Sequence, residues 1–107
     1  MKIFIAAEGK DVEANVAARF ARCDVLMGYD TDNDEIIEAV DNPYKDGMGG
    51  VGVKVSNYIA EKGYEAAIGP HTGPNATNAL KEAGIEVFTF QGKIKDAIKA
   101  FKEAHNL

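Results

Sequence analysis

The chain opens on a nearly continuous apolar run, residues 2–8 (KIFIAAE), and no other feature restricts its possible folds as much. A strand with one face in water alternates apolar and polar residues, so an unbroken apolar run predicts a strand buried on both faces, in the middle of a sheet. Covering both faces requires helices in two outer layers. With 107 residues the chain can build one such core but not two, and we expect a single domain over residues 1–107.

Apolar periodicity and turn-forming residues predict the remaining elements of an α/β fold. The expected order is strand 2–8, strand 25–30, strand 35–40, helix 49–62, strand 65–69, helix 76–83, strand 86–90 and helix 94–101. Residues 31–34 (TDND) are turn formers, which predicts a hairpin between the second and third strands. Residues 6–23 fit either a helical stripe or an ordered loop.

Chain direction then predicts the sheet. A hairpin makes the second strand antiparallel to its neighbours, and right-handed βαβ crossovers make the fourth and fifth strands parallel to the first. The expected strand order is 3-2-1-4-5, with helices on both faces. In this arrangement Cys23, Met48, His71 and the glycine-rich segment 41–52 converge at one edge of the sheet, where α/β proteins commonly bind ligands.

The overall charge excludes some partners. A formal charge of -5 at neutral pH and a pI near 4.9 remove the electrostatic attraction that drives nucleic-acid binding. The apolar stretch at residues 1–7 is too short for a signal-peptide core, and no later stretch approaches a membrane-spanning length. We therefore expect a cytoplasmic protein with neither nucleic-acid nor membrane partners.

The converging edge is less acidic than the rest of the chain. Its segments, residues 8–23, 42–52, 69–75 and 91–93, carry five positive and four negative side chains. Predicted helix starts near Gly49 and Pro74 would direct free N–H groups and partial positive charge toward it. Arg19 and Arg22 could hold an anion by forked hydrogen bonds while Phe20 anchors the loop; alternatively, they are surface charges around a core phenylalanine.

Several segments together resemble the dinitrogenase iron-molybdenum cofactor biosynthesis family of the NifX type. They are the opening MKIFIAAEGK, Arg19-Phe20-Ala21-Arg22, Asn42-Pro43, Gly49-Gly50-Val51-Gly52, Gly69, Gly73-Pro74-Asn75-Ala76 and the segment 83–87 (AGIEV). The resemblance implies a three-layer ribonuclease-H-like fold. It also implies a metal-sulfur cluster as ligand, since characterised relatives carry nitrogenase cofactor precursors or a molybdenum-copper-sulfide cluster. The candidate cofactor-binding residues are Arg19, Arg22, Gly49, Gly50, Gly73 and Asn75.

Cys23 and His71 are the candidate metal ligands. Thiolate and imidazole donors suit copper, iron or zinc better than magnesium or calcium. Two donors are too few for a closed site, and Cys23, as the single cysteine, allows neither a disulfide nor a four-cysteine cluster. The alternative is that Cys23 is a small buried hydrophobe and His71 an exposed loop residue. His105, near the C-terminus, is expected to be solvated.

The sequence favours a non-catalytic carrier of an anionic molybdenum-, iron- or copper-sulfide cluster, with a delivery or acceptor protein as a further partner. The second hypothesis is a sensor of small anions or nucleotides, because Gly47, Gly49 and Gly52 fit G-x-G-x-x-G, although they do not directly follow a strand. The third is a nuclease dependent on divalent metals, for which the first strand supplies only Glu8.

Overall fold

The computed structural model describes residues 1–107 and has the element order βββαβαβα, as predicted. The elements are β1 (Lys2–Ala7), β2 (Val25–Asp30), β3 (Glu35–Asp41), α1 (Val51–Glu61), β4 (Ala66–Gly69), α2 (Pro74–Glu82), β5 (Glu86–Thr89) and α3 (Ile94–Ala104). Asp34, the last residue of the predicted hairpin turn, adopts a φ of 51°. Short polar residues tolerate this left-handed conformation, which explains the turn signal in the sequence.

The five strands form one mixed sheet in the order β3-β2-β1-β4-β5, which confirms the predicted order. β1 pairs antiparallel with β2 and parallel with β4, and β4 pairs parallel with β5. β2 also pairs antiparallel with β3, so β2 alone runs against the other four strands. As a result, the chain leaving β1, the chain entering β2 and the chain leaving β4 all lie at the same end of the sheet.

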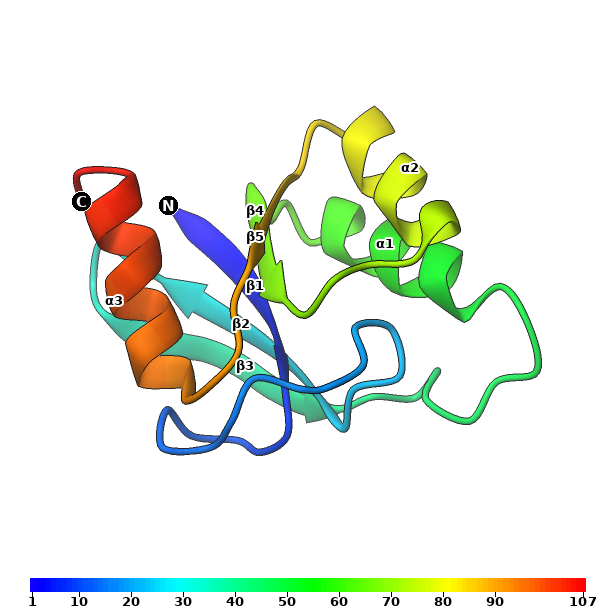
Figure 1. The fold of residues 1–107 in the computed structure, drawn as a ribbon, viewed down its shortest axis with the longest axis horizontal. Helices are drawn as coiled ribbons and strands as arrows, with labels where there is room; N and C mark the ends of the chain where they lie inside the picture. The colour runs from blue at the N-terminus through cyan, green and yellow to red at the C-terminus, as the bar shows by residue number, and fades with distance from the viewer.

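Helices cover the two faces of the sheet in separate layers (Figure 1). Alternate side chains of β1 enter different cores: Phe4 and Ala6 lie in the cluster that includes α1 and α2 residues, whereas Ile3 and Ile5 lie in the cluster that includes α3 residues. All four are fully buried, which is the burial that the apolar opening run predicts. None of the helices combines the length and apolarity needed to cross a membrane.

Residues 8–24 form an ordered loop, which decides between the two alternatives that the sequence leaves open. Two isolated bridges fix this loop: Ala7 with Val16 near its start, and Asn15 with Lys93 just before α3. The amide of Ala17 donates to the carbonyl of Ala6 at 2.8 Å. Because these partners include residues distant in the sequence, local periodicity alone could not identify the loop.

His105 connects the end of α3 to the start of β5, contrary to the expectation that it is solvated. Its ring stacks on Phe101 with ring centroids 4.0 Å apart, and its Nε2 lies 2.8 Å from Oε1 of Glu86. The hydrogen bond to Glu86, followed by the one to the Phe101 carbonyl, raises the pKa of His105 above its ordinary value of 6.5. Protonation of His105 therefore stabilises the folded state.

The His105–Glu86 contact predicts a pH-dependent part of the stability. A raised pKa contributes stability that is complete below the unfolded-state pKa and is lost as pH rises through the folded-state pKa. We expect Glu86→Gln to lower the free energy of unfolding at about pH 5.5, where His105 is protonated, with the difference shrinking by about pH 8.5. Urea unfolding across this range measures it. His71→Gln is the control, and an equal effect of Glu86→Gln at both pH values would contradict the assignment.

Candidate functional site

An open cavity of about 460 Å³ lies where the loops at the end of the sheet meet the starts of α1 and α2. Its lining, which we call the arginine cavity, consists of residues 18–22, Gly52, His71 and residues 73–76. In Figure 1 the loop before β2 lies beside the segments that lead into both helices. The predicted convergence of distant loops at this end of the sheet is therefore present.

Phe20 anchors the arginine cavity to the core. The ring is buried and packs edge-on against Phe4, with ring centroids 5.9 Å apart. It also lies over Gly69, at the end of β4, so closely that a Cβ on Gly69 would come within 2.8 Å of the Phe20 Cδ1. A glycine is needed at this position because any side chain would displace the ring. Arg19, next to Phe20 in the chain, and Arg22, two residues after it, both line the cavity.

Hydrogen bonds tie the same loop to the chain that leaves β3. The Asn42 Nδ2 donates to the carbonyls of Ala21 and Cys23, both at 2.9 Å. The Arg22 Nη1 donates to the Lys45 carbonyl at 2.8 Å, and the Lys45 ammonium pairs with Asp24. Residues 21–24 are thus fixed by Phe20 in the core, by the buried side chain of Asn42, and by Lys45 at the surface.

The starts of α1 and α2 lie side by side at the arginine cavity. The caps are Gly50, with a φ of 65° that favours glycine, and Gly73, followed by Pro74; neither cap makes a side-chain hydrogen bond to the helix. A Cβ on Gly52 would lie 3.3 Å from the Ala76 Cβ, so the small residues allow the two helix starts to approach closely. Backbone N–H groups and the positive ends of two helix dipoles therefore favour an anion here.

Most of the predicted site residues line this cavity. Arg19, Arg22, His71, Gly73 and Asn75 are among its lining residues. Gly49 and Gly50 lie before the first residue of α1 instead, and Gly52, the second residue of α1, lines the cavity. The sequence signal for Gly52 was its position in the glycine-rich run, but its approach to Ala76 requires the fold.

The two arginines give the cavity its charge. They are the only arginines in the chain, and both line the same cavity in a protein of net charge -5. The side chains of Arg19 and His71 make no hydrogen bond or ion pair in the structure, so their donors remain available to a ligand. Arg22 uses one nitrogen for the Lys45 carbonyl, and its guanidinium has further donors.

Cys23 lies outside the arginine cavity. It is 2% exposed, and its thiol lies 3.3 Å from the Val25 carbonyl, within the core cluster on the α1 side of the sheet. Burial raises the pKa of the Cys23 thiol to about 11. Cys23 borders a smaller hollow of about 210 Å³ that shares Arg19 and Arg22 with the arginine cavity but does not include His71.

The structure places no three His, Cys, Asp or Glu side chains close enough together to hold a metal ion. This includes the surroundings of Cys23 and His71, which line different hollows. Met48, at the tip of the glycine-rich loop, is fully exposed to solvent. The side chains and helix starts that line the arginine cavity offer hydrogen-bond donors and positive charge.

The fold and the cavity define a class: three-layer α/β proteins in which arginines and two helix starts line an open cavity at the end of a mixed sheet. Residues 1–104 match the family model described as dinitrogenase iron-molybdenum cofactor. The chain belongs to this family, and the resemblance stated from the sequence is confirmed.

Several known proteins are similar to this chain. The apo form of the orange protein from Desulfovibrio gigas aligns with a TM-score of 0.90 and 27% identity, over 96% of this chain and 88% of that one. A Thermotoga protein provisionally named NifB, of the DUF35 family, aligns with a TM-score of 0.80 and 38% identity, over 95% and 87% of the two chains. An uncharacterized protein of Methanocaldococcus jannaschii is 34% identical over 91 residues, which are 82% of this chain and 77% of the relative.

The contact between Phe20 and Gly69 predicts the effect of a single methyl group. Gly69→Ala should lower the free energy of unfolding by about 1–3 kcal/mol, because the added Cβ overlaps the Phe20 ring. Gly73→Ala is the matched control: its Cβ would meet nothing within 4 Å, and its backbone has an ordinary φ of -71°. Urea unfolding of both variants measures the difference, and equal stabilities would contradict the anchoring role of Phe20.

Burial of Cys23 predicts a thiol that is inert in the folded protein. At about pH 8 a thiol with so high a pKa is almost entirely protonated, and the core shields it from reagents. We expect reaction with a thiol-specific disulfide reagent to proceed only at the rate of unfolding, and to become rapid in urea. Rapid labelling under native conditions would show that Cys23 is accessible for metal coordination.

Proposed function

We propose that this protein is a non-catalytic carrier that binds an anionic metal-sulfur cofactor in the arginine cavity. The observation that supports the proposal most strongly is the placement of both arginines, His71 and two helix starts around one cavity of about 460 Å³. Membership in the dinitrogenase iron-molybdenum cofactor family supports the same class of ligand.

The chemistry of the lining fits a molybdenum-, iron- or copper-sulfide cluster. Such clusters carry negative charge on outward-facing sulfur and oxygen atoms, which accept hydrogen bonds from guanidinium and backbone N–H groups. Arginine suits this role because its charge is permanent and its donors form a rigid fork. We propose that the cluster arrives with its own metals, that His71 adds a donor or a ligand, and that Cys23 stays in the core.

Two finer assignments belong to the same proposal. The strand order with an antiparallel β2, and helices on both faces, supports the ribonuclease-H-like assignment of the fold. A carrier also requires a protein that delivers or accepts the cluster, and the openness of the arginine cavity to solvent leaves room for direct transfer.

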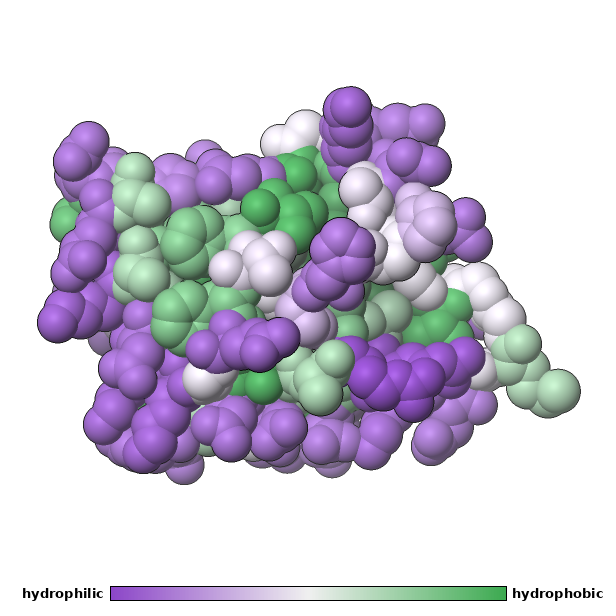
Figure 2. Space-filling view, in the orientation of Figure 1, coloured by the Kyte–Doolittle hydropathy of each residue, from purple (hydrophilic) through white to green (hydrophobic).

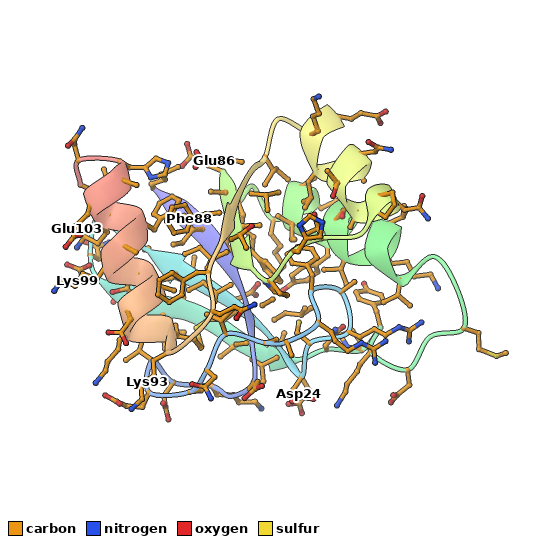
Figure 3. The ribbon with its side chains drawn as sticks, in the orientation of Figure 1. Asp24, Glu86, Phe88, Lys93, Lys99 and Glu103 are labelled. Atoms are coloured by element: carbon orange, nitrogen blue, oxygen red, sulfur yellow. The ribbon has the colours of Figure 1, made fainter.

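The proposal predicts saturable binding of a thiometallate. Anaerobic titration with tetrathiomolybdate and copper(I) should yield a coloured protein whose charge-transfer band remains with it through gel filtration. Arg19→Gln and Arg22→Gln should each weaken binding by about tenfold or more, because each removes hydrogen bonds between charged groups. Lys99→Gln is the matched control, since it removes one positive charge from α3, far from Asp24 and the arginine loop in Figure 3.

Other outcomes identify other functions. A colourless, metal-free protein after gel filtration would contradict the carrier. Thermal stabilisation by nucleotides or phosphate but not by thiometallates would favour the sensor of small anions. Cleavage of RNA or DNA with magnesium or manganese, abolished in Glu8→Gln, would favour the nuclease.

A further inference from the structure

The outer edge of β5 is open to solvent. β5 is the last strand of the sheet and pairs only with β4. The amides of Glu86 and Phe90 donate to carbonyls at the two ends of β4, so the alternating residues Val87 and Thr89 direct their N–H and C=O groups away from the sheet. A free edge of this kind can pair with another strand.

The surface along this edge is apolar. Phe88 is half-buried and packs edge-on against Phe101 of α3, with ring centroids 5.4 Å apart, and Phe90 packs at the margin of the same core. Figure 2 shows apolar surface over part of β5 and the adjoining side of α3. Edge strands are usually protected by lysine, proline or a bulge, and β5 has none of these.

The opposite edge of the sheet, β3, exposes Ile37 and Val40 but has two protective features. β3 has a register shift opposite Gly28 and Tyr29, which leaves Ile37 unpaired, and it carries Glu35, Glu38 and Asp41. Antiparallel pairing of β3 with another β3 about a twofold axis at Glu38 would place the two Glu38 residues opposite one another and Glu35 opposite Asp41. The bulge and the charges therefore disfavour self-pairing of β3 in that register, whereas β5 has no bulge and a single charged residue, Glu86.

We propose that β5 pairs antiparallel with β5 of a second copy of this chain, about a twofold axis at Phe88. In this register Val87 of each copy lies opposite Thr89 of the other, and both residues have outward N–H and C=O groups, so the pair closes four hydrogen bonds. The two Phe88 side chains become directly opposed at the non-hydrogen-bonded position, where aromatic pairs stabilise antiparallel strands.

The charges along the edge fit this symmetric pairing. Glu86 lies at one end of β5 and Lys93 beyond the other, with Phe88 between them (Figure 3). A twofold axis at Phe88 places the two Glu86 carboxylates at opposite ends of the paired strands. Each Glu86 then lies near the C-terminal end of β5 in the other copy, which is the end that leads to Lys93. No lining residue of the arginine cavity takes part, so the paired chains would keep two independent cavities.

Sedimentation equilibrium of the full chain between about 10 µM and 1 mM tests the pairing, and we expect a reversible monomer–dimer equilibrium. Thr89→Pro removes an outward N–H without removing a bond to β4, and should weaken the dimer by about tenfold or more. Thr89→Val retains the N–H and is the matched control. Circular dichroism confirms that each variant is folded.

Amide hydrogen exchange of the unmodified chain gives an independent measurement. Exchange at Val87 and Thr89 should slow as the protein concentration rises, whereas exchange at residues of the β3 edge should not change. A chain that remains monomeric up to about 1 mM would overturn the proposal. A dimer that Thr89→Pro leaves intact, or that Thr89→Val disrupts equally, would also overturn it.

Discussion

The site depends on the reversed direction of β2 beside β1. β1 is buried on both faces from Ile3 to Ala7 and pairs antiparallel on one side and parallel on the other. This reversal brings the chain leaving β1, the chain entering β2 and the chain leaving β4 to a single end of the sheet. Without it the arginine loop and His71 would lie at different ends, and no cavity would form between them.

Close packing of small residues then determines the shape of the cavity. Gly69 makes room for the Phe20 ring, and Gly52 allows α1 to approach Ala76 of α2. These contacts bring arginines and helix starts together although the chain as a whole is acidic. The positive charges of the two arginines and the helix starts repel one another only weakly, because the cavity is open to water. An anionic ligand would reduce this repulsion further.

The order of elements could be predicted from the sequence because its signals are local. Apolar runs mark the buried strands, and Gly63 and Gly84, with φ near 78° and 75°, follow the ends of α1 and α2. Residues 8–24 have no such signal, since their path is set by Phe20 in the core and by contacts with Gly92 and Lys93. The His105–Glu86 contact likewise joins elements that only the fold brings together.

The candidate site was predictable only in part, because some of its residues carry sequence signals and others depend on the fold. Arg19, Arg22, Gly73 and Asn75 follow from family resemblance and from the expected convergence of loops, and all four line the cavity. Gly52 lines the cavity, whereas the predicted residues Gly49 and Gly50 do not. Which glycine faces the cavity depends on where α1 begins, and the left-handed cap at Gly50 determines that position. Burial of Cys23 depends on the direction of one side chain relative to the core, and composition does not specify it.

The most direct test of the account is the location of the bound anion. Nuclear magnetic resonance of ¹⁵N-labelled protein, titrated anaerobically with tetrathiomolybdate, reports each amide and arginine side chain separately. The account predicts shifts at Gly52, Gly73 and Ala76 and at the Nε signals of Arg19 and Arg22, with α3 unaffected. Binding that shifts α3 or the β3 edge, and leaves the arginine cavity unchanged, would contradict it.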